Sequence, residues 1–376
     1  MNSRQRVLMA LNHQEPDRPP VDLGATENTT ITRIAYQNLR LHLGLGEDPE
    51  PFVINRPMDA VFPAEDLLRR FAVDFRPLRP SSDWAPEVRQ MPDDSFYDEL
   101  GVRWKKAAYY YDMVEHPLEG ADFAEIARFR WPDPAVPGRL AGLRAQAKDL
   151  YEHGEHAIVL ADLFWGPFEL GCALRGYEQF CMDLLLDVKL AEYLLDKNLD
   201  AALGFYDAFL SEVGEYIQVV GIGDDLCMQT GPIMSPATYR KMIKPRHKEL
   251  VDLIRSKTDA KVFMHCCGSV YGLLPDLIEV GVEIISPVQL SAAGMDPARL
   301  KREFGQELTF WGGGVDTQRV LPFGTLAEIR DQVKRMIDIF APGGGFVFNP
   351  VHNIQADISP ERILAVYETA LGGKFR

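Results

Sequence analysis

The stretch Lys261-Val-Phe-Met-His-Cys-Cys-Gly-Ser269 is a short apolar run that ends in a histidine and two cysteines. Its apolar part predicts a buried strand, and the Gly-Ser pair predicts the turn into a following helix. Side chains alternate along a strand, so His265 and Cys267 face one side while Cys266 faces the other. We therefore predict that only His265 and Cys267 share a site, at the carboxyl end of this strand.

An imidazole and a thiolate on one strand face suit Zn²⁺, which takes nitrogen and sulfur ligands in tetrahedral sites. Catalytic zinc needs three protein ligands, so another part of the chain must supply the third. The alternative is that these are ordinary interior side chains, because Cys is among the most buried residue types and His often packs with its nitrogens satisfied. Both interpretations stay open at this point.

From about residue 139 onward, predicted strands alternate with predicted helices, and this order predicts a parallel sheet with crossover helices. With one or two further units near the N-terminus, the count reaches about eight, which closes a (β/α)8 TIM barrel. A doubly wound open sheet is the alternative. The predicted strands are 157–160, 216–220, 261–265, 282–285, 308–311 and 345–348.

The N-terminal part of the chain is less regular. Residues 3–11 predict a short amphipathic helix, and residues 21–24 and 72–76 predict two strands. The stretch 27–71 predicts mainly helix with a Pro-rich interruption.

Alternating and aromatic-rich segments within residues 88–111 predict a small antiparallel meander. We interpret it as an insertion, at about 80–131, over a larger scaffold. The predicted organisation is a single barrel domain over residues 1–376 that carries this insertion.

Polar side chains follow the predicted strands where each one ends. In a barrel these ends converge on one mouth, where the active site lies. The candidates for binding substrate there are Asp162, Asp224, Gln289, Asp316 and Asn349.

His352 follows the last predicted strand, and no cysteine follows Cys267. His352 is therefore the best candidate for a third metal ligand with His265 and Cys267, and for a catalytic role. The alternative is a substrate-binding histidine without a metal. Asp225, in a Gly-rich turn, is a second catalytic candidate that could orient a metal-bound histidine or carry a proton. Alternatively, it caps its loop or pairs with an arginine.

The composition limits the classes of partner. The chain has 55 acidic and 40 basic residues, a net charge of −15, which argues against nucleic acid and anionic membrane surfaces. The most apolar stretches are interrupted by aspartates, so we expect no membrane span. The five cysteines show no repeated spacing and the N-terminus lacks a signal-peptide apolar core, so we expect reduced thiols and a cytoplasmic location.

Several motifs, spread over nearly the whole chain, together resemble the uroporphyrinogen decarboxylase superfamily, which includes cobalamin-dependent methyltransferases. They are Arg6-Val-Leu-Met-Ala-Leu, Asp17-Arg-Pro-Pro-Val, Gly223-Asp-Asp-Leu, Gly231-Pro-Ile-Met-Ser-Pro236, His265-Cys-Cys-Gly268, the run from Trp311 to Gln318, and Pro350-Val-His-Asn-Ile-Gln355. The resemblance implies a (β/α)8 barrel. In the methyltransferase branch a His-x-Cys at this place, with a later cysteine, binds zinc. Here the matching residues are His265 and Cys267, and His352 stands in the segment of the later cysteine.

The resemblance to the methyltransferase branch implies a zinc-dependent enzyme that moves a methyl group between a small methyl ether, alcohol or thiol and a corrinoid. A separate corrinoid-binding protein would carry the corrinoid, because the chain shows no Asp-x-His-x-x-Gly segment. We also allow for a homodimer.

Two rival functions stay open. The first is a cofactor-free decarboxylase of the uroporphyrinogen type, which fits less well because the Arg-rich N-terminal motif of that enzyme is absent after Arg18-Pro-Pro. The second is a non-catalytic barrel that binds a corrinoid or a substrate.

Overall fold

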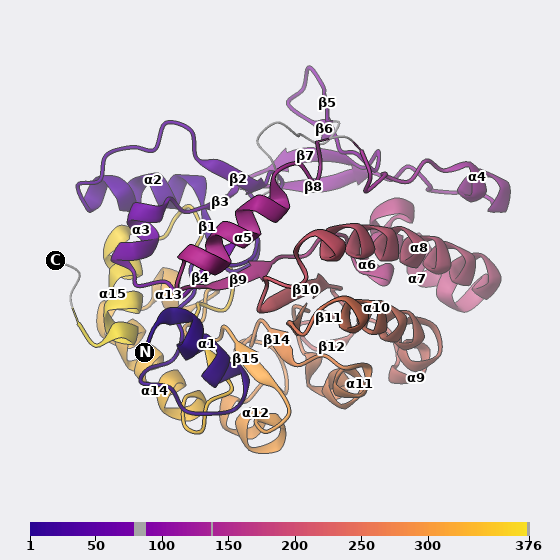
Figure 1. Ribbon diagram of the computed structural model, residues 1–376. Helices are drawn as coiled ribbons and strands as arrows, with labels where there is room; N and C mark the ends of the chain where they lie inside the picture. Colours follow the sequence, from indigo (N-terminus) through magenta and orange to yellow (C-terminus); the bar gives the residue numbers. More distant parts are fainter. Residues whose placement is uncertain (79–87, 137, 374–376) are drawn as a thin grey trace.

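The computed structural model describes residues 1–78, 88–136 and 138–373. Its centre is a parallel sheet of seven strands in the order β16-β15-β14-β13-β10-β9-β4, ringed by helices (Figure 1). The strands are β4 (Phe75–Pro77), β9 (Ala157–Leu160), β10 (Val219–Gly223), β13 (Lys261–His265), β14 (Ile284–Ser286), β15 (Thr309–Trp311) and β16 (Phe346–Val347).

Residues 20–22 close this sheet into a barrel, because they lie between its two edge strands. Val21 pairs in parallel with Phe348, just beyond β16, and the amide of Asp22 donates to the Phe348 carbonyl at 2.9 Å. On the other side the amide of Asp74, just before β4, donates to the Val21 carbonyl at 2.9 Å. The predicted eight-stranded barrel is thus confirmed, and the open sheet is excluded.

Large apolar side chains fill the interior of the barrel. Trp311 is fully buried, and its ring centroid lies 4.5 Å from that of Phe75 and 5.3 Å from that of Phe263. On β13, Val262 and Met264 instead pack into the layer between the sheet and the helices. This alternation is the period of two that a strand imposes on its side chains.

The crossover helices form the outer layer. In the barrel part of the chain they are α5 (Leu143–His153), α6 (Pro167–Arg175), α7 (Tyr177–Leu186), α8 (Val188–Val213), α9 (Pro236–Thr238), the π-helix η1 (Tyr239–Ile243), α10 (Lys244–Lys257), the 3-10 helix η2 (Val270–Leu273), α11 (Leu274–Val280), α12 (Pro297–Phe304), α13 (Val320–Phe323), α14 (Leu326–Phe340) and α15 (Pro360–Leu371). The N-terminal part adds α1 (Ser3–Leu11), α2 (Arg33–His42), α3 (Glu65–Arg70) and α4 (Phe123–Arg128).

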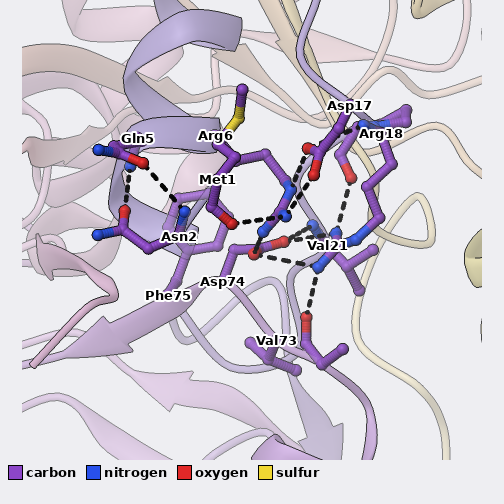
Figure 2. Close-up of polar contacts among 12 residues, drawn as sticks. Met1, Asn2, Gln5, Arg6, Asp17, Arg18, Val21, Val73, Asp74 and Phe75 are labelled. Carbon is purple, nitrogen blue, oxygen red and sulfur yellow. Dashed lines mark hydrogen bonds and ion pairs between the residues drawn. The ribbon is translucent and has the colours of Figure 1, made fainter.

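An ion-pair network at the amino end of the barrel strands holds α1 and the closing segment together (Figure 2). The Asp74 carboxylate is fully buried and accepts from Arg6 and Arg18, each at 2.7 Å, and from the Val21 amide at 2.8 Å. Arg6 also pairs with Asp17 at 2.7 Å and holds the pKa of that carboxyl down at about 2. These motif residues therefore stabilise the barrel, at the end opposite to the strands' carboxyl ends.

The predicted antiparallel insertion is confirmed as a four-stranded sheet that projects at the top of Figure 1. Residues 80–87, the first part of the predicted insertion, lie outside the described residues. The prediction that residues 1–376 form one domain stays a prediction. The strands are β5 (Arg89–Gln90), β6 (Phe96–Tyr97), β7 (Arg103–Ala107) and β8 (Tyr110–Glu115).

The expectation that residues 27–71 are mainly helical was wrong in part. Besides α2 and α3, this stretch forms the antiparallel sheet β1-β3-β2, with β1 (Ile31–Thr32), β2 (Phe52–Asn55) and β3 (Ala60–Phe62). Residues 60–62 are all buried, and Asp59 has a φ of 51°, which turns the chain between β2 and β3. Burial and turn geometry determine the secondary structure of residues 27–71. Local residue propensities are weak here and do not reveal either factor.

The strand predicted at 216–220 lies three residues later, as β10 (Val219–Gly223). The Tyr216 amide donates to the Val213 carbonyl at the end of α8, so residue 216 still belongs to the turn out of that helix. Gly223 pairs in register with His265, which places it beside the candidate site. Among the described residues, no helix combines the length and apolar composition needed to cross a membrane.

Candidate metal centre at the barrel mouth

His265 and Cys267 lie together at the carboxyl end of β13, as the alternation of strand side chains predicts. The Cys267 Sγ is 3.4 Å from the His265 Nε2. Cys266 points the other way and is fully buried in the main core, where its thiol contacts Cys227. The predicted division of the three side chains is confirmed.

A tight turn after Cys267 fixes this arrangement. Gly268 has a φ of +95°, a conformation that side chains rarely adopt, and a Cβ there would lie 2.6 Å from the Met228 carbonyl. The Gly268 amide donates to the Gln289 side chain at 2.6 Å. Met228 belongs to β11 (Cys227–Met228), which pairs with β12 (Gly231–Pro232), so this small hairpin packs directly against the turn.

His352 joins the pair from the segment after β16. Its ring centroid lies 5.6 Å from that of His265, and one ligand atom from each of His265, Cys267 and His352 falls within 4.8 Å of the others. The next residue, Asn353, holds the segment in place, because its side chain accepts from the Thr30 amide at 2.8 Å and donates to the Glu27 carbonyl at 2.7 Å. Two segments far apart in the sequence therefore bring three candidate ligands together.

Burial sets the protonation states of these groups. It lowers the pKa of His265 to about 4, and burial together with neighbouring His265 lowers the pKa of His352 to about 4. Both imidazoles are therefore neutral near pH 7, with a lone pair free for coordination. Burial also raises the pKa of the Cys267 thiol, and a divalent cation would displace its proton.

This donor set fits the zinc that the family resemblance implies. Catalytic zinc takes three protein ligands from imidazole, thiolate and carboxylate and keeps a fourth position open. Two neutral imidazoles and one thiol within 4.8 Å of one another meet that requirement.

Asp225 supports the candidate metal ligands through a hydrogen bond. Its Oδ1 accepts from the Cys267 amide at 2.8 Å and lies 3.8 Å from the His265 Nε2. Its own amide donates to a carboxylate oxygen of Glu169 at 3.4 Å. Burial raises the pKa of Asp225, although the Cys267 amide and His352 oppose that effect.

Asp162 lies against β10, whose Gly223 pairs with His265. Its carboxylate fits against β10 only because that strand has glycine there: a Cβ on Gly221 would lie 2.2 Å from Oδ1, and one on Gly223 would lie 2.6 Å from Oδ2. Oδ1 is buried and has no hydrogen-bond partner among the described residues. Burial, with the carboxyls of Glu27 and Asp225, raises the pKa of Asp162 to about 8.

Asp224 affects the site by holding Glu169 in position. Its carboxylate accepts from the Phe168 and Glu169 amides, at 3.2 and 2.7 Å, and so caps the start of α6. It also lies 2.9 Å from the His247 Nε2. Burial and the two neighbouring aspartates raise the pKa of Glu169 well above its usual value.

The structure places the other predicted substrate-binding residues in different surroundings. Gln289 lines the pocket described next and supports Gly268. Asp316 accepts from the Gln318 and Arg319 amides, which closes its own turn. Asn349 donates to the Asp22 and Thr29 carbonyls. Substrate contacts by these residues stay predictions.

A pocket of about 350 Å³ opens beside the metal centre. Its lining includes Cys267, Asp225, Cys227, Met228 and Tyr177. The metal-ligand candidate Cys267 is therefore exposed to a space of the size that small ligands occupy.

Sequence reasoning missed Glu27, Glu169, Tyr177 and Cys227. Glu169 carried a detectable signal, because Pro167 marks the first turn of a helix that follows a strand, and the third helical position then lies at the barrel mouth. Glu27 and Tyr177 lie in or next to loops, and nothing in their local sequence predicts where they point.

This chain is similar to known proteins over much of its length. A family model described as uroporphyrinogen decarboxylase matches residues 102–371. A methylcobamide:CoM methyltransferase, MtaA, from Methanosarcina barkeri is 28% identical over 199 residues, which cover 51% of this chain and 54% of the relative. The match thus spans about half the length of that relative.

Two further proteins match over most of the chain. A uroporphyrinogen decarboxylase from Aeromonas salmonicida is 23% identical and covers 86% of this chain and 92% of the relative. The solved structure of a methyltransferase from Methanosarcina mazei superimposes with a TM-score of 0.68 at 18% identity, covers 99% of both chains, and supports the fold. With the family model matched over residues 102–371, the chain belongs to the uroporphyrinogen decarboxylase family.

Proposed function

We propose that this chain is a zinc-dependent methyltransferase that moves a methyl group between a small methyl ether, alcohol or thiol and the corrinoid of a separate protein. The observation that carries the proposal is the convergence of His265, Cys267 and His352 beside a pocket at the barrel mouth. The names of the Methanosarcina relatives support methyl transfer as the reaction.

The residues have distinct roles in this proposal. His265, Cys267 and His352 would hold zinc, which when bound supplies a Lewis acid for the oxygen or sulfur of the substrate. Asp225 positions Cys267 through its Oδ1, and its Oδ2 remains available to hold a proton. In the demethylating direction that proton passes to the oxygen or sulfur as its bond to the methyl group breaks. The heteroatom keeps the electron pair of the broken bond, and the methyl group would bond to the partner's reduced cobalt(I) corrinoid, which would supply the electron pair of the new bond.

The barrel mouth also suits a corrinoid that is carried by a separate protein. The pocket is open on the outer side, and Met228 and Tyr177 in its lining are 63% and 43% exposed. A corrinoid protein would therefore present its cobalt at the pocket, while Tyr177 of α7 and the β11–β12 hairpin frame the substrate.

Methyl transfer from methylcobalamin to a small thiol tests this function directly. The thiolate sulfur gains the methyl group, and the cobalt–carbon bond breaks with both electrons left on cobalt, so cob(I)alamin accumulates under anaerobic conditions. Zinc-loaded protein should produce this spectral change, and Cys267→Ser should not. Full activity of metal-free protein, or decarboxylation of uroporphyrinogen in place of methyl transfer, would contradict the proposal.

A further inference from the structure

Two free cysteines meet between α6 and α7, away from the candidate metal ligands. Cys172 is fully buried on α6, and Cys181 is partly exposed on α7. The Cys172 thiol donates a hydrogen bond to the Cys181 sulfur. The two sulfur atoms are therefore neighbours, and one of them is accessible from outside.

The two helices pack closely at this point. Gly171 and Phe180, the residues just before the two cysteines, face each other, and a Cβ on Gly171 would lie 2.3 Å from the Phe180 ring. About one turn away, Arg175 of α6 and Asp183 of α7 form a buried ion pair. These contacts hold the thiols together. Close packing is what a disulfide requires, because its two Cβ atoms lie only about 4 Å apart.

The two thiols differ in protonation. The hydrogen bond from Cys172 lowers the pKa of Cys181 to about 7, whereas burial raises the pKa of Cys172. Cys181 is therefore about half thiolate near neutral pH, and the thiolate is the form that reacts with oxidants. Cys172 keeps its proton and is shielded from solvent. The pair thus combines one reactive thiol with one that is placed to react only with its neighbour.

We propose that Cys172 and Cys181 form a redox-sensitive pair, which a peroxide oxidises to a disulfide between α6 and α7. The Cys181 thiolate attacks one oxygen of hydrogen peroxide, the O–O bond breaks, and the hydroxide that leaves is protonated to water. The Cys172 sulfur then attacks the sulfenic sulfur of Cys181. The S–O bond breaks, and the second hydroxide takes up the Cys172 proton to form water. In all, the two thiols lose two electrons to the peroxide.

The disulfide would join two helices that lie at the candidate site. α6 carries Glu169, whose carboxylate accepts from the Asp225 amide, and α7 begins at Tyr177, which lines the pocket. Oxidation would therefore fix these two helices relative to each other. The inference goes beyond methyl transfer and does not depend on it or on zinc, because its test measures only the state of these two thiols.

Trypsin can separate the two cysteines, because Arg175 lies between them. After cleavage at Lys148, Arg175 and Lys189, Cys172 lies in the peptide 149–175 and Cys181 in the peptide 176–189. Native full-length protein is treated with hydrogen peroxide, its remaining thiols are alkylated under denaturing conditions, and the digest is analysed by mass spectrometry. We expect the two peptides to appear as one linked species, which dithiothreitol separates.

Two variants assign the roles of the thiols. Cys172→Ala should leave Cys181 as a sulfenic acid that dimedone traps, and no linked peptide should form. It should also slow the alkylation of Cys181 by iodoacetamide at neutral pH several-fold, because the thiolate loses its hydrogen-bond donor. Cys181→Ser should leave the buried Cys172 reduced. The wild-type measurement stands alone if either variant folds poorly.

Several outcomes would overturn the inference. They are peptides that stay separate while peroxide oxidises Cys181, a linked peptide that forms only after the protein is unfolded in urea, a disulfide between the Cys181 residues of two chains, or a Cys172 that reacts before Cys181. The proposed function is judged separately, by zinc content and by cob(I)alamin formation, so that each can fail without the other.

Discussion

The Cys267 Sγ lies 3.4 Å from the His265 Nε2 because the two residues occupy alternate positions at one end of β13. Their neighbour Cys266 is fully buried in the core on the other side of the strand. A single strand thus separates the face of the candidate metal ligands from a packing face within three residues.

The two adjacent cysteines should therefore differ in their effect on zinc. Cys267→Ser should remove most of the bound zinc, because it deletes the only thiol of the three-residue donor set. Cys266→Ser, its matched control, should keep zinc near one atom per chain. Elemental analysis of both purified variants measures this. Equal loss of zinc from the two variants would show that the assigned strand faces are incorrect.

Gly221→Ala should disturb the site through Asp162. The new Cβ would lie 2.2 Å from the Asp162 Oδ1, so the carboxylate must move. We expect a loss of about 1 to 3 kcal/mol in unfolding free energy, typical of overpacking. Urea denaturation measures it. Gly272→Ala is the control, because a Cβ there meets no heavy atom within 4 Å; equal stability losses would refute the proposed contact.

Asp162 should also make the stability of the metal-free protein depend on pH. Burial and neighbouring carboxyls raise its pKa to about 8, against about 4 in an unfolded chain. Between these values the folded state keeps a proton that the unfolded state has lost, so this residue's contribution to stability falls as pH rises from about 4 to about 8.

Asp162→Asn removes that titration and keeps the shape of the side chain. The variant should gain stability relative to the wild type as pH rises from about 4 to about 8, at up to about 1.4 kcal/mol for each pKa unit. Denaturant unfolding at several pH values measures the difference. A difference that stays constant with pH would contradict the buried environment assigned to Asp162.

Asp74→Asn should weaken the closure of the barrel. The substitution removes the buried charge that Arg6 and Arg18 share, so that Arg6 retains only Asp17 and Arg18 loses its carboxylate partner at the amino end of the strands. We expect a loss of about 3 to 5 kcal/mol in unfolding free energy. Asp252→Asn, which breaks an exposed ion pair with Lys248, should cost much less. Similar losses in the two variants would mean that the Asp74 network contributes little.

The alternating strands and helices from about residue 139 onward could be predicted from the sequence, because their local sequence patterns agree with the way they pack. The strands at 157–160 and 261–265 occur as predicted, and the Thr325 and Glu328 side chains form the capping box that starts α14. The His265 and Cys267 pairing followed from strand alternation alone.

Other features depend on contacts between distant segments. The hairpin at 52–62 forms where burial outweighs weak local preferences. The strand predicted at 21–24 closes the barrel at 20–22, but its pairing with Phe348 and Asp74 could not be read from its own residues. Pro167 marks the helix that carries Glu169, but the place of Glu169 in the site also depends on Asp224, which follows β10 and caps that helix from a distant part of the chain. Such relationships have no local sequence pattern, so the carboxyl groups around the metal centre could not be assembled from the sequence.

The most direct test of the central claim is the zinc affinity of His352→Ala, measured by titration against a competing chelator. If His352 is the third ligand, zinc affinity should fall by much more than the roughly 10- to 100-fold typical of a residue that only supports a ligand. The exposed residue His153 provides the control, and His153→Ala should keep wild-type affinity. An unchanged zinc affinity in His352→Ala would contradict the assignment of His265, Cys267 and His352 as the metal centre, even if that variant were inactive.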